Sequence, residues 1–339
     1  MTERHFPAGK LPHQVLERLI GQYTRPDPRL VVPPGLGEDA AVIEFGDRYL
    51  VAKTDPITFV TEDIGWYAIH VNANDIASMG AVPRFFLAAI VVPEDQATEA
   101  LIESIFRSIH QAAAELDITV CGGHTEITHG IDRPIVVGQM LGEVGRDELV
   151  RSSGLVPGDV VLLTKGMAIE ATAIIAREKR AELVERGYDE AALARCAAYL
   201  TDPGISVIAE ARLATAAGQV HAMHDPTEGG VATGLMEIAA ASGVGLEVLE
   251  EGLHTSDDSD RLCREFGLDP FGVISSGALL IGCPAADEAA IVAALGGQGI
   301  EARRIAAVRA PDFGLQMRRT DNALVPLPRF EVDEITRLF

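Results

Sequence analysis

Two strand patterns follow each other directly in the first sixty residues, with only the turn Gly46-Asp47 between them. Residues 40–46 and 48–56 are rich in the apolar and β-branched side chains that strands favour. A parallel, doubly wound sheet needs a helix between successive strands, so these two segments do not fit one. The sequence therefore predicts an α+β protein with a mixed sheet.

Helix and strand patterns alternate along the rest of the 339 residues. The first half adds a helix pattern over residues 64–80 and a buried strand over 85–93, and the second half restarts with a strand at 160–165. A polar stretch with Gly and Pro at 151–159 lies between them, as expected of a domain boundary. We therefore predict two domains, residues 1–155 and 156–339.

The composition excludes several classes of protein. Asp and Glu outnumber Lys and Arg by 50 to 28, and the net charge of -22 argues against a nucleic-acid or anionic-membrane partner. No apolar run approaches the ~20 residues of a membrane span, and the first residues lack a signal-peptide core. The four cysteines form no CxxC pair, which is typical of the reducing cytoplasm. A phosphate ligand would need a metal ion held by carboxylates.

Three aspartates lie on separate predicted elements and can hold such an ion. Asp39 follows a glycine-rich turn at Gly37, Asp55 ends the second strand, and Asp75 lies in the helix at 64–80, three residues after Asn72 on one helix face. Mg²⁺ binds carboxylates together with phosphate oxygens. The alternative is that these are ordinary turn and surface acids. A dinucleotide-binding reading of residues 35–40 fails, because a strand and not a helix follows the glycines.

Glycine-rich motifs mark two further segments. Gly122-Gly123 follows a strand pattern and precedes His124 and Glu126, which fits either close backbone approach to a ligand or a tight turn. His124, Glu126 and His129 could bind zinc, but no HExxH spacing supports that.

The second segment runs from Asp225 to Gly230. Asp225 suits a helix N-cap, Pro226 the first helical position and Glu228 a capping-box partner, so a helix is expected over 226–241. Such an end can bind an anion, and a simply capped helix is the alternative.

In this order, the motifs resemble those of one superfamily, which contains aminoimidazole ribonucleotide (AIR) synthetase, thiamine-monophosphate kinase, selenophosphate synthetase and the hydrogenase maturation protein HypE. The resemblance spans about residues 9 to 310. It rests on five motifs, at residues 37–42, 72–83, 122–126, 225–230 and 267–280.

This resemblance implies a two-domain protomer whose N-terminal domains pair into a β-barrel across a homodimer, with ATP bound between subunits. It implies an enzyme that phosphorylates or activates a small-molecule acceptor. The expected metal ligands for Mg²⁺ are Asp39, Asp55 and Asp75, and the expected catalytic residues are Asp75, His124 and Glu126. Nucleotide contacts are expected from Gly37, Asp39, Lys53, Asn72, Gly122 and Gly123, and acceptor contacts from Asp225, Thr227, Gly229 and Gly230.

The chain also departs from these families. HypE acts through a C-terminal cysteine, whereas no cysteine follows Cys283 here, and the kinase and HypE patterns have Asp where this chain has His124. Two alternatives therefore stay open, a HypE-like maturation factor that acts on a protein partner and a nucleotide-binding scaffold without turnover.

Overall fold

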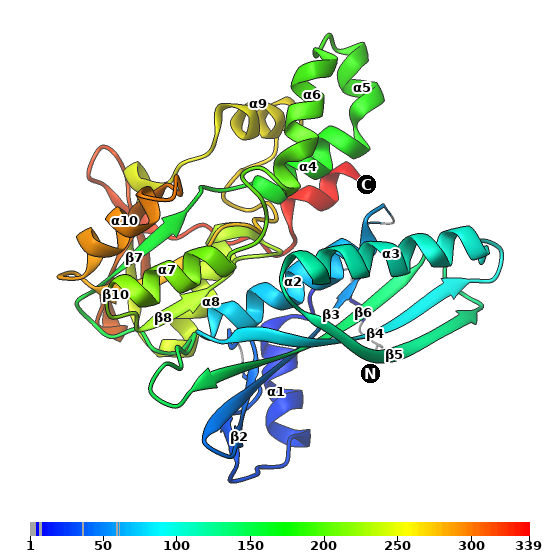
Figure 1. Cartoon of the computed structure of the whole chain (residues 1–339). Helices are drawn as coiled ribbons and strands as arrows, with labels where there is room; N and C mark the ends of the chain where they lie inside the picture. The colour runs from blue at the N-terminus through cyan, green and yellow to red at the C-terminus, as the bar shows by residue number, and fades with distance from the viewer. Residues whose placement is uncertain (1–4, 7–8, 36, 59, 61) are drawn as a thin grey trace. The chain divides into compact units, whose positions relative to one another are not determined.

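The computed structural model describes residues 5–6, 9–35, 37–58, 60 and 62–339 (Figure 1). The chain divides into two compact units. The N-terminal unit comprises residues 26–33 and 39–149, and the C-terminal unit comprises 150–339 together with 34–38 and the described residues up to Arg25. This grouping differs from the predicted division of 1–155 and 156–339, because the start of the chain packs with the C-terminal unit. That long-range contact leaves no local signal in the sequence.

The N-terminal unit contains a six-stranded sheet in the order β1-β2-β3-β6-β4-β5. All neighbouring strands are antiparallel except β4 and β5. The strands are β1 (Leu30–Val32), β2 (Ala41–Phe45), β3 (Arg48–Ile57), β4 (Val82–Pro93), β5 (Thr119–Thr128) and β6 (Ile135–Gly145).

The predicted hairpin is present, since Phe45 pairs with Arg48 across the two-residue turn and Gly46 takes the positive φ of 66° that such turns favour.

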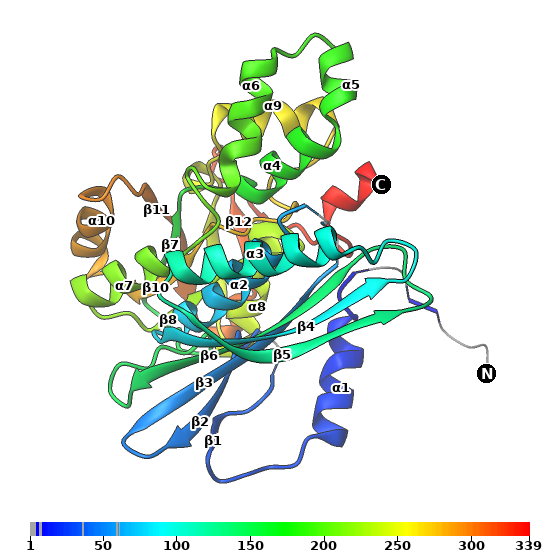
Figure 2. The same ribbon diagram turned by 45° about the vertical axis from the view of Figure 1, so that its right-hand side comes forward.

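Helices α2 (Ile64–Ser78) and α3 (Glu99–Glu115) cover one face of this sheet (Figures 1 and 2). Gly65 lets the two helices approach closely, because a Cβ there would lie 2.7 Å from the carbonyl oxygen of Ile105. Phe86 and Met140 fill the core between sheet and helices. The opposite face carries apolar side chains that are only partly buried, such as Leu87 and Ala89 on β4. The two faces of the sheet therefore lie in different environments.

The C-terminal unit is built on a seven-stranded sheet in the order β13-β12-β9-β11-β7-β10-β8. Neighbouring strands are antiparallel except β12 and β9. The strands are β7 (Asp159–Thr164), β8 (Ala222–His224), β9 (Gly245–Leu249), β10 (Leu280–Pro284), β11 (Ala302–Arg309), β12 (Leu315–Arg318) and β13 (Leu324–Pro326).

The described residues of this unit form eight α-helices, five of which contribute side chains to one apolar core. They are α1 (His13–Tyr23), α4 (Ile169–Glu178), α5 (Arg180–Glu185), α6 (Glu190–Ala197), α7 (Ile208–Ala217), α8 (Gly230–Ser242), α9 (Asp257–Glu265) and α10 (Glu288–Gly296), with short 3₁₀ turns η1 (Ala198–Leu200), η2 (Glu250–Gly252), η3 (Pro311–Phe313) and η4 (Glu334–Leu338). Two mixed sheets with helices confirm the predicted α+β class. Within the described residues, no helix is long and apolar enough to cross a membrane.

Candidate functional site

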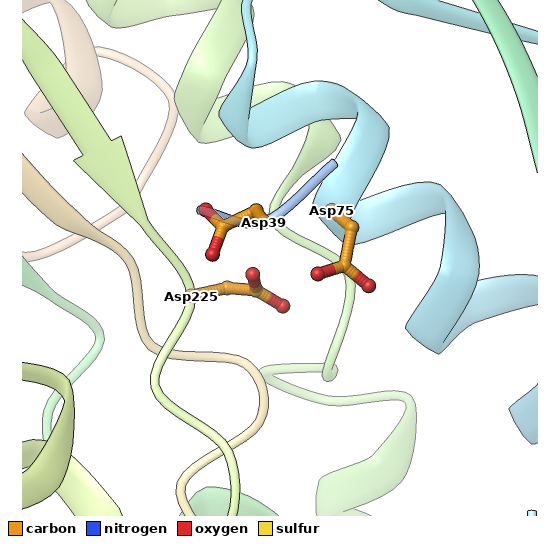
Figure 3. Close-up of side chains that lie close together, drawn as sticks. All are labelled: Asp39, Asp75 and Asp225. Atoms are coloured by element: carbon orange, nitrogen blue, oxygen red, sulfur yellow. The ribbon is translucent and has the colours of Figure 1, made fainter. Parts of the chain in front are cut away.

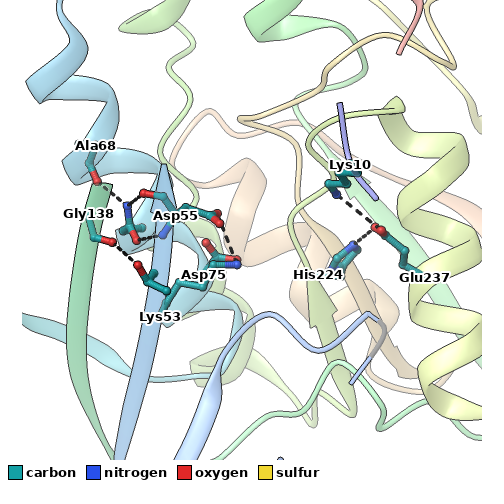
Figure 4. Close-up of polar contacts among 10 residues, drawn as sticks. Lys10, Lys53, Asp55, Ala68, Asp75, Gly138, His224 and Glu237 are labelled. Atoms are coloured by element: carbon teal, nitrogen blue, oxygen red, sulfur yellow. Dashed lines mark hydrogen bonds and ion pairs between the residues drawn. The ribbon is translucent and has the colours of Figure 1, made fainter. Parts of the chain in front are cut away.

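The N-terminal unit brings together the charged residues that the sequence singled out. Lys53 and Asp55 lie two residues apart on β3, so both point toward the face that α2 covers, where Asp75 meets them. Lys53 Nζ lies 2.9 Å from Asp75 Oδ1 and 3.4 Å from Asp55 Oδ2 (Figure 4). Asp39, just before β2, adds a third negative charge that acts on Lys53. Lys53 therefore pairs with Asp55 and Asp75, and the charge of Asp39 acts on the same ammonium group.

These carboxylates fit a divalent cation of the Mg²⁺ type. One oxygen of Asp39 and one of Asp75 lie within 4.8 Å of each other, and Figure 3 shows both side chains. Two ligands of one octahedral Mg²⁺ ion lie roughly 3 to 4 Å apart, given metal–oxygen distances of about 2.1 Å. A small adjustment of either side chain would therefore allow both to bind one ion. Oxygen atoms are also the donors that this hard cation prefers.

Lys53 remains charged inside this cluster. Burial alone would lower the pKa of Lys53, but the carboxylates of Asp75, Asp55 and Asp39 outweigh it and raise the pKa above its ordinary value. Three carboxylates and one ammonium group leave an excess of negative charge. A divalent cation would neutralise that excess.

Asn72 holds the backbone of Asp55 in place. Its Oδ1 accepts a hydrogen bond from the Asp55 backbone N–H at 2.9 Å, and its Nδ2 donates to the carbonyl oxygen of Ala68 at 2.9 Å. The side chain is fully buried. Both ends of the amide are thus used within the protein, so Asn72 positions Asp55, whereas the sequence predicted a direct contact with the nucleotide.

His124 and Glu126 lie on the other face of the same sheet. In the strand register, His124 is level with Ala89 and Val137, whereas Lys53 is level with Met140 and Phe86 on the helix-covered face. Strand β5 is also three positions from β3, which corresponds to about 14 Å. Within a single chain, the predicted catalytic set of Asp75, His124 and Glu126 therefore does not form one cluster.

The side chains of His124 and Glu126 are mostly exposed, with His124 Nε2 3.5 Å from Glu126 Oε2. His129 Nδ1 pairs with Glu94 Oε1 at 2.8 Å, away from His124. The structure gives the zinc reading of this segment no support.

The sequence indicated that the pair Gly122-Gly123 follows a strand. In the structure the pair lies inside β5. A Cβ on Gly123, whose φ is +152°, would lie 2.2 Å from the carbonyl oxygen of Ala88 on the neighbouring strand. The register also slips between Phe86 and Leu87 at this point. Close approach of β4 therefore explains Gly123 without any ligand. A Cβ on Gly122 would meet Leu87 Cδ2 at 3.6 Å, an ordinary contact distance, so this exposed residue has no such close neighbour.

Gly37 also has a structural explanation, within the C-terminal unit. It takes a φ of +74°, and a Cβ there would lie 2.5 Å from the carbonyl oxygen of Glu237 on α8. The glycine therefore permits close packing on a helix.

The segment from Asp225 to Gly230 leads from β8 into α8, but the helix starts later than predicted. It begins at Gly230 with Gly229 as the N-cap, so Asp225 and Pro226 do not cap it. Gly229 and Gly230 have φ of 82° and 66°, and a Cβ on Gly230 would lie 2.6 Å from two backbone carbonyl oxygens. The two glycines therefore shape the turn, and Asp225 (also drawn in Figure 3) and Thr227 carry its side-chain chemistry.

Beside this segment lies an ion-pair network that sequence reasoning missed. Glu237 on α8 contacts two partners, His224 Nε2 at 3.1 Å and Lys10 Nζ at 3.5 Å (Figure 4). The network ties the start of the chain and the end of β8 to one helix. The residues of this network are far apart in sequence. The only sequence signal for it is that His224 directly precedes the Asp225 motif.

Two buried acids close to the Gly229 turn were also missed. Burial raises the pKa of Glu170 on α4 to about 7, a hydrogen bond from Ser276 opposes this, and the charges of Asp333 and Glu228 raise it further. Burial likewise raises the pKa of Asp333 to about 6, although backbone N–H groups, including that of Gly229, lower it. Glu170 and Asp333 are isolated acids outside any motif, so the sequence gives no sign that they are buried.

Comparison with known proteins accords with this architecture. The model of the AIR synthase related protein N-terminal domain matches residues 37–144, and that of the C-terminal domain matches 156–317. The chain is 34% identical over 283 residues to the carbamoyl dehydratase HypE of Cupriavidus necator, covering 81% of this chain and 77% of that protein. It is 29% identical over 245 residues to the thiamine-monophosphate kinase of Bacillus subtilis, covering 68% and 71%.

Among solved structures, a hydrogenase maturation protein HypE in complex with ATP shares the fold, with a TM-score of 0.70 and 23% identity over 94% of this chain and 91% of that one. Both domain models together match most of the sequence, in the order that the motifs predicted. The chain belongs to the AIR synthase-related family.

Proposed function

We propose that this protein is an ATP-dependent enzyme that phosphorylates or activates a small-molecule acceptor. The observation that carries the proposal is the convergence of Asp39, Asp55 and Asp75 around Lys53. The carboxylates would hold Mg²⁺ on the triphosphate, and Lys53 would neutralise a phosphate oxygen. The names of a kinase and a dehydratase among the relatives, and the ATP in a structure of the same fold, support this choice.

Asp225 and Thr227 are the residues that we propose for acceptor contacts. Their segment has side chains able to accept and donate hydrogen bonds, whereas Gly229 and Gly230 contribute shape. Gly122 remains a candidate for close approach by the nucleotide, because it is exposed and has no side chain. His124 stands where related families have Asp. It lies on the opposite face of the sheet from Lys53, so this difference does not alter the three aspartates around Lys53.

The proposal is tested by melting the protein with Mg²⁺ and ATP, ADP, GTP or no nucleotide. A ligand that binds only the folded protein raises the melting temperature by mass action. We expect a rise with ATP that requires Mg²⁺. No rise at millimolar Mg·ATP would refute the proposal.

A second candidate is a HypE-like maturation factor that acts on a protein partner. The 34% identity to the Cupriavidus necator protein favours it. Copurification of one stoichiometric protein, together with ATP turnover only in its presence, would select this function over activation of a small molecule. ATP binding with no ADP formed under either condition would leave a non-catalytic scaffold.

We further propose that two copies pair along β5 into a homodimer. β5 is the last strand of its sheet, and nearly all of its residues are exposed. Val120, Ile127 and the neighbouring Phe85 on β4 are 44%, 54% and 43% exposed. An open strand edge lined by apolar side chains is suited to pairing with an identical edge.

Ile127→Lys should therefore convert a dimer into a monomer, because a charge on a paired edge is costly to bury. Sedimentation equilibrium would detect the loss of a species with twice the 36.1 kDa chain mass. Val156→Lys, at a 47% exposed site in the C-terminal unit, is the matched control and should stay dimeric. A wild-type protein that sediments as a single chain would contradict the pairing.

A further inference from the structure

The N-terminus of α8 is occupied by groups of the chain itself. Helix starts expose N–H groups and carry a partial positive charge, which attracts anions. Here the Gly229 N–H donates to Asp333 Oδ2 at 2.6 Å. The Gly230 N–H donates to the carbonyl oxygen of Thr227 at 3.0 Å, and the Ala232 N–H to that of Phe271 at 3.0 Å. The anion at this helix start is thus a carboxylate from 104 residues further along the chain.

The C-terminal segment holds Asp333 firmly. Asp333 Oδ1 accepts from the Ile335 N–H at 2.8 Å and so caps η4. The Glu334 N–H donates to the carbonyl oxygen of Gly272 at 3.1 Å. The ring of Phe330 packs directly on Gly272, where a Cβ would lie 2.4 Å from it. Contacts on both sides of Asp333 therefore fix where its carboxylate points.

The turn that Asp333 contacts has an unusual backbone. Gly229 and Gly230 both have positive φ, which glycine adopts as readily as negative φ, so the two residues do not by themselves fix the shape of the turn. We propose that Asp333 is a positioning residue, whose carboxylate fixes the turn from Thr227 to Gly230 in the shape that the acceptor site requires. The acceptor role of this turn rests on the proposed function above, whereas the fixing of the turn does not.

The surrounding charges indicate what this end of α8 does not bind. The charge of Glu228 acts on both Asp333 and Glu170, and Glu170 is almost fully buried. A phosphate group would meet these carboxylates in addition to the one already seated on the Gly229 N–H. An acceptor would therefore be recognised through the neighbouring side chains of Asp225 and Thr227, with the helix start acting as a fixed support.

The contact should depend on pH. A carboxylate makes a stronger hydrogen bond to an N–H group than a neutral carboxyl does. The pKa of Asp333 is raised to about 6 by burial, so the contact is complete above that pH and weakens as the pH falls through it. The acids that face it are Glu228 and Glu170, and protonation of Glu170 also falls in this range.

The experiment is amide hydrogen exchange on the full chain, followed in peptides that cover residues 227–235, for wild type, Asp333→Ala, Asp333→Asn and Asp321→Ala. Asp321 is the matched control, since its carboxylate accepts a backbone N–H elsewhere in the same unit. At pH 7.5 we expect exchange about tenfold faster in Asp333→Ala and an intermediate rate in Asp333→Asn, as for loss of a charged hydrogen bond. The control should match wild type.

Two further measurements separate positioning from general stability. Sodium formate, compared with sodium chloride at equal ionic strength, should restore protection in Asp333→Ala by placing a carboxylate on the vacant N–H. Protection in wild type, corrected for intrinsic exchange, should fall below pH 6, and Asp333→Asn should lack this step. Unchanged exchange in Asp333→Ala, faster exchange that formate does not reverse, or a wild-type protein without the pH step would overturn the proposal. The Mg·ATP melting shift in the same variants should equal that of wild type, and its absence from wild type would refute the proposed function alone.

Discussion

Asp75→Asn should remove the thermal stabilisation by Mg·ATP while leaving the protein folded. Asp75 supplies one carboxylate of the cluster, and Asn keeps its size and one acceptor oxygen but removes the charge. At a ligand concentration of about 100 times Kd, binding stabilises a protein by about 2.7 kcal/mol. We expect most of that gain to disappear, because Mg²⁺ binding depends on the charge of its ligands.

The control for this experiment is Asp132→Asn. Asp132 is an exposed acid of the same unit that pairs only locally with Arg133, at 3.1 Å. It should show the wild-type rise in melting temperature. Titration with Mg²⁺ at fixed ATP separates metal binding from nucleotide binding, since the variant should need far more Mg²⁺ for the same rise. A full-sized rise in Asp75→Asn at wild-type Mg²⁺ concentrations would show that the nucleotide binds elsewhere.

The carboxylate cluster could be anticipated because Asp39, Asp55 and Asp75 lie in or beside consecutive elements of the chain. Asp55 lies near the end of a clear strand pattern, and Asp75 lies in α2, the next element along the chain. A helix that follows a hairpin packs on one face of it to bury its apolar side, which brings Asp75 over β3. Strand alternation then places Lys53 on the same face as Asp55.

The location of His124 could not be predicted in the same way. Which face a strand residue occupies depends on register, and a slip of one residue reverses it. The β4–β5 ladder contains such a slip between Phe86 and Leu87. Sequence motifs group His124 with Glu126 and the nucleotide site by family resemblance, but the chain itself places them on the opposite face.

The start of α8 shows how tertiary contacts override a local capping signal. Asp225, Pro226 and Glu228 have the residue types and spacing of a helix start, yet the helix begins at Gly230. Asp333, from the far end of the sequence, accepts the N–H of the N-cap residue Gly229. Local patterns reflect the helix propensity of each residue. They contain no information on a carboxylate that a distant segment places beside the helix.

The second large effect concerns Glu170, whose replacement by Gln should stabilise the protein at neutral and alkaline pH. Glu170 is almost fully buried, and its Oε2 has no hydrogen-bond partner in the described part of the structure. Burial raises the pKa of Glu170 to about 7 from the ordinary value of 4.5. The folded protein therefore keeps a proton that the unfolded chain has already released, so stability falls as the pH rises from about 4.5 to about 7.

That difference in pKa corresponds to about 3 kcal/mol once the pH is above 7, which Gln would recover because it stays neutral while keeping an oxygen for Ser276. Urea unfolding at pH 5, 6, 7 and 8 measures it. The gain of Glu170→Gln over wild type should be small at pH 5 and grow to its full size by pH 8. Glu182→Gln, on the exposed α5, should show no such growth. A difference between Glu170→Gln and wild type that is equal at all four pH values would show that folding does not raise the pKa of Glu170.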